Sequence, residues 1–495
     1  MNYQSTRGRS GESLTSAQII KQGLAADGGL FIPESIPTLS ESEINSLISD
    51  SYPVRAAKIL SKFLTDYTYE ELLADTTEAY SKESFPGGAA PLVKTHDGIY
   101  SLELWHGPTA AFKDMALQIM PRLLSRALTK TGEERTALIL VATSGDTGKA
   151  ALEGYKDVDG IKIMVFYPVD GVSRVQKLQM ATQMGSNVNV TAIYGNFDDA
   201  QSGVKKIFSD KDAAEYLDGK GYFFSSANSI NWGRLAPQIV YYVSAYCDLL
   251  AGGEIKMGDK INVCVPTGNF GNIFAAYLAK LMGLPIDRLV CASNKNNILT
   301  DFLDSGRYDR NRDFHLTMSP SMDILISSNL ERLLALTAGK EATDGYMKSL
   351  ADKGYYEVDS TTKAKIDESF CGFFADEDRC AATIRRYFED YGYLADTHTA
   401  VGLSCAEQYI AKTGDKTPMV VASTASPYKF AADVCVSLGL DRPEDDLDAL
   451  ALLSTYSKTE ISYPLRDLDK REVRFTAVTQ PEKMLDAVKE YVEGN

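Results

Sequence analysis

Apolar runs that alternate with helical patterns constrain the fold of this 495-residue chain more than any other feature. Each run is followed by a pattern typical of an amphipathic helix. The runs are 138–142, 161–168, 187–193, 261–266, 289–293 and 418–422. Continuous apolar strands separated by helices indicate parallel sheets covered on both faces, so we predict an α/β fold. In such sheets ligands bind beyond the carboxyl ends of the strands, and the loops there are the place to look for chemistry.

The length of the chain predicts more than one domain. Strand signals at 3–7 and 26–33, followed by helical patterns at 40–49, 53–67 and 68–80, indicate an N-terminal α+β domain. We expect this domain over 1–91, a large domain over 92–125 and 221–450, a small domain over 126–220, and a C-terminal segment over 451–495.

Composition excludes several classes of function. A net charge of −16 argues against a nucleic-acid partner, and it requires any anionic ligand to be held by local donors. The chain has no apolar run of about 20 residues and no secretory signal pattern, so we expect no membrane partner and a cytoplasmic location. Seven scattered cysteines favour free thiols, and four widely spaced histidines predict no metal site.

A turn at 107–109 leads into an apolar helical pattern that contains Lys113. We expect Thr109 to be the N-cap, which places Lys113 about one turn into the helix between Phe112 and Met115. Loss of hydration among apolar groups lowers the pKa of an amine and makes it nucleophilic, so that it can form a Schiff base with an aldehyde. The commoner role of a single lysine is a surface one with a buried stem.

Two strand-end loops are rich in donors. The first, 141–150, is not a nucleotide-binding P-loop, because Thr143 stands where that motif needs glycine and Ala150 where it needs serine or threonine. Its hydroxyls and amides suit a carboxylate, although a capped turn is the alternative. The second, 266–272, has two glycines and two asparagines before an apolar helix, a composition that suits a phosphate monoester. It lacks the dinucleotide pattern, and a simple turn is the alternative.

Two further loops are polar. Residues 225–234 gather hydroxyls, amides and Arg234 without a nearby carboxylate, a cluster that can bind an anion. A helix cap with Arg234 on the surface is the alternative. Residues 423–430 follow the last apolar run, where the hydroxyl of Thr424 can face a heteroatom of a buried ring. A core or capping role is the alternative for this threonine.

Taken in order, these stretches resemble the threonine synthases, which are pyridoxal-phosphate enzymes of the tryptophan-synthase-β-like fold type. The resemblance covers nearly the whole chain and rests on 5–7, 23–33, 106–109, 112–114 and 423–425. It implies two αβα domains with parallel sheets and an N-terminal α+β domain. Asp146 and the N-terminal unit are similar to the fungal and enteric-bacterial branch, which implies a monomer without an activator domain.

The resemblance also implies roles for individual residues. Lys113 would carry pyridoxal 5'-phosphate as a Schiff base, with Phe112 near the ring and Thr424 at its nitrogen. The residues implied for the cofactor phosphate are Gly268, Asn269, Phe270, Gly271 and Asn272. Those implied for the substrate carboxylate are Ser144, Gly145, Asp146 and Thr147. Asp146 would also face the phenolic oxygen of the cofactor. Those implied for the substrate phosphate are Asn228, Ser229 and Arg234.

The activity implied is conversion of O-phospho-L-homoserine and water to L-threonine and phosphate, by γ-elimination and β-hydration. Rival hypotheses are a serine/threonine dehydratase, a phospho-amino-acid lyase and a non-catalytic metabolite-binding protein. A dehydratase needs no second anion site, so the cluster at 228–234 argues against it. Intact Lys113 and Thr424 argue against a non-catalytic role.

Overall fold

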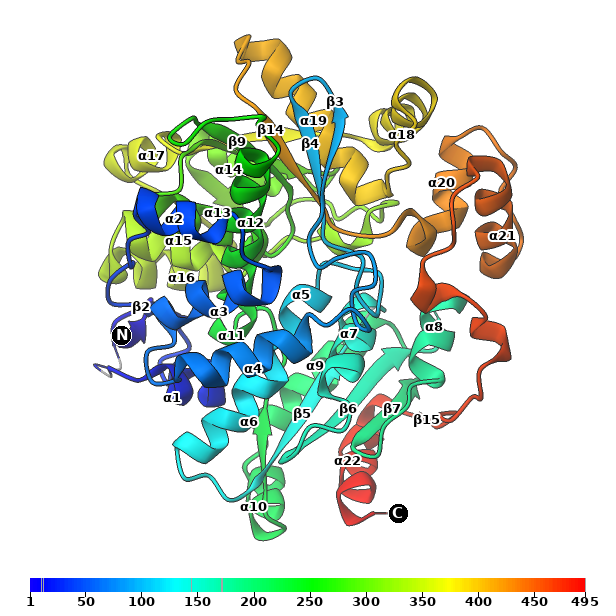
Figure 1. Cartoon of the computed structure of the whole chain (residues 1–495). Coiled ribbons are helices and arrows are strands. Elements are labelled where there is room, and N and C mark those ends of the chain that lie inside the picture. Colours follow the sequence, from blue (N-terminus) through cyan, green and yellow to red (C-terminus); the bar gives the residue numbers. More distant parts are fainter. Residues whose placement is uncertain (10, 12, 144, 171, 495) are drawn as a thin grey trace.

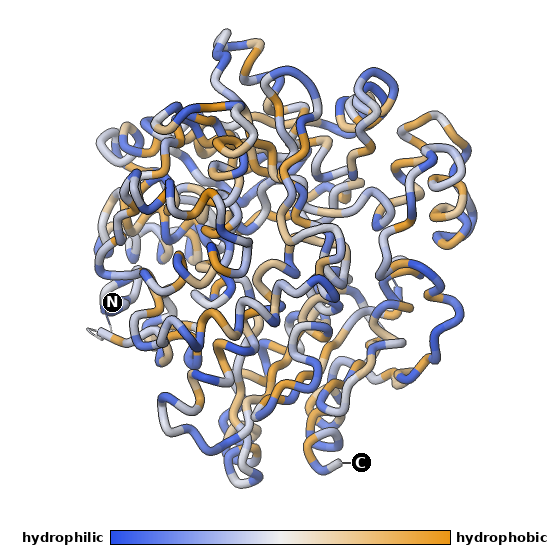
Figure 2. The backbone as a smooth tube through the Cα atoms, in the orientation of Figure 1, coloured by the Kyte–Doolittle hydropathy of each residue, from blue (hydrophilic) through white to orange (hydrophobic). Residues whose placement is uncertain are grey.

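Two mainly parallel β-sheets covered by helices form the frame of the molecule (Figure 1). The computed structural model describes residues 1–9, 11, 13–143, 145–170 and 172–494. Apolar segments are frequent along the strands inside the fold, and polar residues along the outer loops (Figure 2). The α/β fold with parallel sheets, which the alternating runs predict, is confirmed.

The larger sheet has six strands in the order β13-β10-β9-β14-β4-β3. They are β3 (Leu92–His96), β4 (Ile99–Glu103), β9 (Ile261–Pro266), β10 (Ile286–Ser293), β13 (Phe370–Phe374) and β14 (Met419–Ser423). All neighbours are parallel except β3 and β4, an antiparallel pair at one edge. Every residue of β9 and β14 is buried, as expected for central strands with helices on both faces.

Helices cover both faces of this sheet. Val263 and Val265 on β9 share a core with the helices α12 and α13, whereas Cys264 faces the opposite side, where α19 packs. The helices of this part are α12 (Pro237–Ala251), α13 (Gly271–Leu281), α14 (Ile298–Ser305), α18 (Glu377–Tyr391), α19 (Thr397–Thr413), α20 (Ala431–Ser437) and α21 (Asp446–Ser457). The alternation along β9 therefore fixes which helix lies on which face.

The smaller sheet has five parallel strands in the order β15-β7-β6-β5-β8. They are β5 (Thr136–Ala142), β6 (Ile161–Pro168), β7 (Val188–Ile193), β8 (Tyr222–Ser225) and β15 (Val478–Thr479). Its helices are α7 (Asp146–Tyr155), α8 (Arg174–Ala181), α9 (Phe197–Ser209), α10 (Lys211–Gly219) and α22 (Met484–Glu493). Leu138 and Leu140 pack with α9 and α22 on one face, while Ile139 faces the main core.

Two strands of the smaller sheet come from outside the range 126–220. β8 pairs with β5, so the sheet extends slightly beyond residue 220. β15 pairs with β7, and the 3₁₀ turns η3 (Tyr463–Leu465) and η4 (Leu468–Lys470) lie along the connection to it from α21. A third turn, η5 (Pro481–Lys483), joins β15 to α22. The C-terminal segment thus completes the smaller sheet, an arrangement that local sequence does not encode. The domain limits themselves stay a prediction.

The N-terminal unit shares the main core. It contains β1 (Tyr3–Ser5), β2 (Phe31–Pro33), α1 (Ser16–Gln22), α2 (Glu41–Leu47), α3 (Tyr52–Phe63) and α4 (Tyr69–Ala79). The rings of Tyr3 and Phe63 lie 5.3 and 5.7 Å from that of Trp232, between centroids. The buried residues of the unit are therefore continuous with the main core.

Residues 307–367 form an addition beside the larger sheet, which the sequence analysis did not anticipate. It contains β11 (Arg307–Asp309), β12 (Tyr355–Glu357), α15 (Leu330–Thr337), α16 (Lys340–Lys353) and α17 (Ser360–Asp367). The stacked rings of Tyr308 and Tyr356, 5.3 Å apart, join the antiparallel pair β11 and β12.

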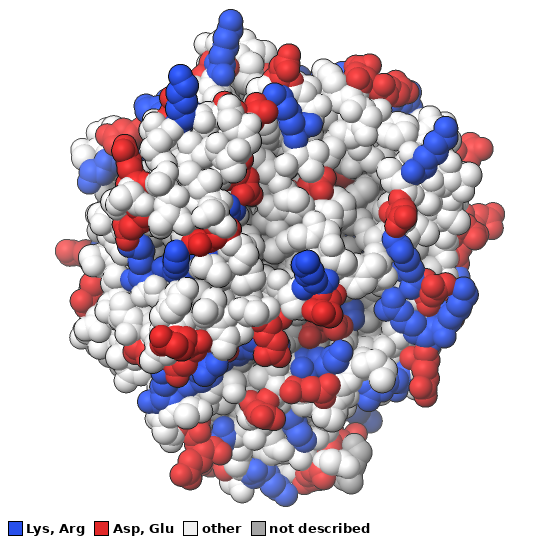
Figure 3. Space-filling model, viewed as in Figure 1, with Lys and Arg blue, Asp and Glu red and all other residues white. Residues whose placement is uncertain are grey.

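The surface carries interspersed acidic and basic side chains on the face shown in Figure 3. Among the helices that the structure describes, none combines the length and the apolar character needed to cross a membrane.

Candidate active site

Lys113 lies at the start of a short helix rather than inside one. The expected N-cap at Thr109 is wrong, because α5 (Asp114–Leu117) begins at Asp114 and Lys113 is its N-cap. The backbone amide and hydroxyl of Thr109 instead donate to the Asp114 carboxylate, at 2.8 and 2.7 Å. This carboxylate closes the turn before the helix, so Lys113 sits at the edge of the turn, and α6 (Met120–Lys130) follows.

The turn is fastened to the end of β14. The Phe112 amide donates to the Thr424 carbonyl (2.8 Å), and the Ser426 amide donates to the Ala110 carbonyl (3.0 Å). Ala110 adopts a positive φ of 60°, which lets the chain turn back toward the sheet. Lys113 and Thr424, more than 300 residues apart in the sequence, are thereby brought together.

The amine of Lys113 is largely enclosed, with 12% of its side chain exposed. Its Nζ lies 3.5 Å from Asp146 Oδ2, 3.3 Å from Ser321 Oγ and 5.6 Å from the centre of the Phe112 ring. Burial lowers the pKa of this amine, and the Asp146 carboxylate opposes the shift. Lys429 and Arg234 lower the pKa further through their positive charges. An amine in this state is prepared for nucleophilic attack and proton transfer at neutral pH.

Asp146 is paired with Lys429, a residue that the sequence analysis missed. Lys429 Nζ lies 3.0 Å from Asp146 Oδ1 and donates to the Thr109 carbonyl at 2.8 Å. Gln176 Nε2 donates to the same carboxylate oxygen at 2.9 Å. Burial alone would raise the pKa of Asp146, but Lys429 and Lys113 outweigh it and hold the pKa far below its usual range. The carboxylate is therefore ionised, and the neighbouring lysines balance its negative charge. The polar loop in the sequence does not by itself indicate this balance.

The loop before α7 caps its own helix. Ser144 lies outside the described residues. Gly145 adopts φ 139°, a conformation that a side chain would strain, and Thr147 is half-buried in the first turn of α7. The hydroxyl of Thr143 accepts from the amides of Gly145 (3.0 Å) and Gly148 (2.9 Å). The amides of Gly145 and Gly148 are therefore used to cap the turn, as the alternative interpretation of this loop predicted. The groups of this loop that are left for a ligand are Asp146 and the residues beside it.

The loop before α13 approaches other chain segments closely. A Cβ on Gly268 would lie 2.6 Å from the Ser321 carbonyl oxygen, so only glycine fits. Phe270 precedes Gly271 at the helix start with φ 61°, and its ring packs on Phe370 in the core, 5.6 Å between centroids. Only the backbone of Phe270 therefore faces the loop.

Two asparagines of this loop have different surroundings. The carbonyl of Asn269 accepts from the backbone and side-chain amides of Asn329, at 3.0 and 2.9 Å. Asn272 Oδ1 accepts from the hydroxyls of Tyr241 (2.6 Å) and Tyr242. Its Nδ2 is buried and has no partner among the described residues. A donor fixed in this way at a helix N-terminus suits an anionic oxygen.

Arg234 is buried without an acidic partner among the described residues. It lies in α11 (Trp232–Leu235), where Nη1 donates to the Ala227 carbonyl (2.5 Å) and Nε is unpaired. Burial lowers the pKa of the guanidinium to about 10. Asn228 is exposed in the preceding loop and accepts from the Ser229 hydroxyl at 3.3 Å. The loop thus supplies an uncompensated cation next to two small polar side chains.

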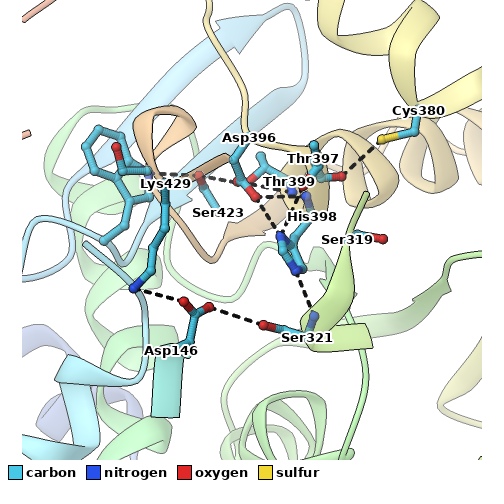
Figure 4. A network of polar contacts seen from close by, with 12 residues as sticks. Asp146, Ser319, Ser321, Cys380, Asp396, Thr397, His398, Thr399, Ser423 and Lys429 are labelled. Atoms are coloured by element: carbon cyan, nitrogen blue, oxygen red, sulfur yellow. Dashed lines mark hydrogen bonds and ion pairs between the residues drawn. The ribbon is translucent and has the colours of Figure 1, made fainter. Parts of the chain in front are cut away.

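A polar network joins the end of β14 to the start of α19 (Figure 4). Ser423 Oγ accepts from Trp105 Nε1 at 3.0 Å and lies 3.0 Å from the Thr399 hydroxyl. Thr399 also donates to Asp396, which caps α19 and accepts from His398 Nδ1 at 3.0 Å. The helix-start pattern Asp396-Thr-His-Thr was the available sequence signal for this network, and the sequence analysis did not use it.

Comparison with known proteins identifies the family to which the chain is similar. Family models match along most of it: "Threonine synthase N terminus" over residues 2–80, "Pyridoxal-phosphate dependent enzyme" over 87–424 and "Threonine synthase, C-terminal" over 399–492. Human "Threonine synthase-like 1" is 39% identical over 89% of this chain, which spans only 60% of that relative's length.

Two relatives match over nearly their whole length. Threonine synthase from Saccharomyces cerevisiae is 34% identical over 99% of this chain and 97% of its own. The crystal structure of threonine synthase from Brucella melitensis with bound PLP superposes with a TM-score of 0.88 at 38% identity, covering 100% of this chain and 99% of that one. The fold is thus that of the type II pyridoxal-phosphate enzymes, and the chain belongs to the threonine synthase family.

Proposed function

We propose that this protein uses pyridoxal phosphate to convert O-phospho-L-homoserine and water to L-threonine and phosphate. The observation that carries the proposal is that the buried amine of Lys113 lies close enough to the buried guanidinium of Arg234 for that positive charge to lower the pKa of the amine. A buried amine of lowered pKa lies within the field of a buried guanidinium that has no acidic partner in the described residues. The amine suits an aldehyde cofactor, and the guanidinium suits a substrate phosphate.

The residues present fit the cofactor. Asn272 Nδ2 is a buried donor without a partner in the described part of the chain, and Gly268 leaves no room for a side chain. Together with the backbone of Asn269, Phe270 and Gly271, they would hold the phosphate at the start of α13. When bound, pyridoxal phosphate would supply a conjugated ring that takes up negative charge from the substrate.

Three further residues would orient the cofactor and move protons. Phe112 would lie against the ring and Thr424 at its nitrogen. Lys113 would remove and return protons on the substrate carbons, because its lowered pKa leaves a larger share of unprotonated amine near pH 7. Asp146 would not act as an acid, since its pKa is held low by Lys429 and Lys113 despite burial. With its charge neutralised, it can lie near the phenolic oxygen without net repulsion.

Substrate binding would use both polar loops. Arg234, with Asn228 and Ser229, would hold the phosphate and stabilise its charge as it leaves. Gly145 and Thr147 would face the carboxylate beside Asp146, as would Ser144 on the basis of the sequence alone. Monomeric state and cytoplasmic location stay predictions of the resemblance and the composition.

The test is assay of the purified chain, loaded with pyridoxal phosphate, for threonine and phosphate from O-phosphohomoserine. Arg234→Ala should lower kcat/KM roughly 100-fold or more through loss of charge-assisted contacts to the phosphate, while cofactor affinity stays unchanged. Arg442→Ala, at an arginine whose side chain is 58% exposed, is the matched control. Unchanged turnover in Arg234→Ala would contradict the phosphate role.

The products separate the alternatives. Equal amounts of threonine and phosphate support the synthase. Phosphate with a keto acid and ammonia, and no threonine, would instead indicate a lyase on the same fold. Failure of the chain to take up pyridoxal phosphate would support a non-catalytic role.

A further inference from the structure

A long connection crosses the front of the candidate active site. Between β11 and α15, residues 310–329 contain only one short 3₁₀ turn, η1 (Pro320–Met322). Connections of this length without regular structure are usually functional. Here the carbonyl oxygen of Ser321 would lie 2.6 Å from a Cβ on Gly268, so this segment, which we call the strap, touches the loop before α13.

Side chains of neighbouring elements hold the strap in place. Asp323 Oδ1 accepts from Asn294 Nδ2 (2.7 Å) and Asn296 Nδ2 (2.9 Å), which follow β10. The hydroxyl of Ser327 donates to the Gly268 carbonyl at 2.6 Å. Both of these anchors follow η1, and the position of the turn itself is set by a further contact.

That contact comes from His398. The backbone amide of Ser321 donates to His398 Nε2 at 3.2 Å. Because Nε2 accepts, the ring proton lies on Nδ1, which donates to Asp396 Oδ1 at 3.0 Å (Figure 4). His398 is buried, with 3% of its side chain exposed, and Asp396 is fully buried. The pair thus fixes the ring and its tautomer, and the ring fixes the turn.

The hydroxyl of Ser321 reaches the reactive amine. Ser321 Oγ lies 3.3 Å from Lys113 Nζ and 3.3 Å from Asp146 Oδ2, and these two atoms are 3.5 Å apart. The hydroxyl can accept from the amine while donating to the carboxylate, which leaves both partners satisfied. Figure 4 shows the resulting line of contacts from Lys429 through Asp146 and Ser321 to His398.

We propose that Ser321 is a positioning residue for the amine of Lys113, and that the Asp396–His398 pair sets Ser321 in place. The inference rests on the proposed function. The hydroxyl of Ser321 would act whenever the amine of Lys113 is not bonded to the cofactor. A freed lysine side chain can rotate away, and the hydroxyl of Ser321 keeps Nζ beside Asp146, where it can take and return protons. A misplacement of about 1 Å is enough to slow such a step greatly.

Ser321→Ala tests the hydroxyl directly. Ser321 is exposed, so the variant should fold normally. We expect kcat to fall about 10-fold with KM nearly unchanged, because one hydrogen bond to a charged group is lost. Covalent attachment of pyridoxal phosphate to cofactor-free protein, followed by its visible absorbance, should slow by a similar factor. Ser321→Thr should recover most of both rates, and Leu316→Ala, at a strap residue that is 88% exposed, should change neither.

His398 variants test the second part. His398→Gln keeps an acceptor that can reach the Ser321 amide, whereas His398→Leu removes it. We expect His398→Leu to slow attachment as Ser321→Ala does, and the double variant to be no slower than either. Glutamine should restore part of the rate.

The outcomes are distinct. If wild-type protein takes up the cofactor and makes threonine while Ser321→Ala attaches the cofactor at the wild-type rate, the positioning role is overturned and the proposed function stands. If the wild-type protein itself takes up no pyridoxal phosphate, the proposed function fails first. A Ser321→Ala protein that lowers only substrate affinity would also contradict the inference.

Discussion

The loops that lead into α7 and α13 are built alike but use their donors differently. Each follows a buried strand and enters its helix through a residue of positive φ, Gly145 at 139° and Phe270 at 61°. Before α7, the Thr143 hydroxyl accepts from two amides, and the first turn carries Asp146. Before α13, the first turn has no acidic residue, and Asn272 keeps an unpaired buried donor.

The difference shows that the N-termini of α7 and α13 serve different purposes. A helix N-terminus attracts negative charge. At α7 the protein supplies that charge itself and balances it with Lys429, so the site presents a fixed carboxylate to Lys113. At α13 no such charge is built in, which leaves the place for an external anion. The predictions below test this division, from the largest expected effect to the smallest.

Removal of the built-in charge at α7 should have the largest effect. Asp146→Ala leaves Lys429, whose side chain is 0% exposed, without its carboxylate. Unpaired buried charges are strongly unfavourable, so we expect the free energy of unfolding to fall by about 3–5 kcal/mol, measured by urea denaturation. Asp146→Ala/Lys429→Met should recover much of this loss. A single variant as stable as wild type would show that the pair is not needed for balance.

Addition of a charge at α13 should act on the cofactor instead. Asn272→Asp keeps the acceptor for Tyr241 and Tyr242 but replaces the unpaired donor by a second oxygen. Repulsion should weaken binding of pyridoxal phosphate by about 2 kcal/mol, or roughly 30-fold, in an absorbance titration. Pyridoxal, which lacks the phosphate, is the control ligand and should bind as to wild type. Equal weakening for both ligands would refute the phosphate role of this loop.

Loss of the hydroxyl at α7 should have a smaller effect. Thr143→Val leaves the amides of Gly145 and Gly148 without their shared acceptor. We expect a loss of about 1–2 kcal/mol in the free energy of unfolding. Thr143→Ser, which keeps the oxygen, is the matched variant. If serine and valine destabilise equally, packing of the methyl group rather than capping is responsible.

The change in stability over a single pH unit should be the smallest of these effects. Lys429 and Lys113 hold the folded-state pKa of Asp146 below its unfolded value of about 4, so near that pH the folded state binds fewer protons. The contribution of ionised Asp146 to the free energy of unfolding is complete above that pH. It is lost as the pH falls toward the folded-state pKa of Asp146, by at most about 1.4 kcal/mol per pH unit.

Urea denaturation at several acidic pH values checks this behaviour. Asp146→Asn should show a shallower decrease in stability with falling pH than wild type. Asp441→Asn, at an exposed residue, should follow wild type. Parallel curves for wild type and Asp146→Asn would contradict the low folded-state pKa.

Local sequence predicted the parts of the site that lie within one loop. The run 261–266 and the glycines and asparagines after it predicted a strand, a turn and a helix with donors at its start, because hydrophobic period and turn chemistry are properties of neighbouring residues. Lys113 became a candidate through its apolar neighbours in the sequence together with the resemblance of the whole set of loops to the family. Its placement relative to the helix was wrong, since the Asp114 carboxylate ends the turn in a way that a capping pattern does not reveal.

Tertiary structure decided which loops meet and how their charges are balanced. The contact of Lys429 with the Thr109 carbonyl spans 320 residues, and that of His398 with the Ser321 amide spans 77. Neither spacing follows a helical or strand period, so no pattern in the sequence could pair these residues. The sequence by itself determined the α/β layers and the donor-rich strand ends. Only the packing of the two sheets determined that Asp146 is neutralised, because a buried charge takes its state from whichever groups the fold brings beside it.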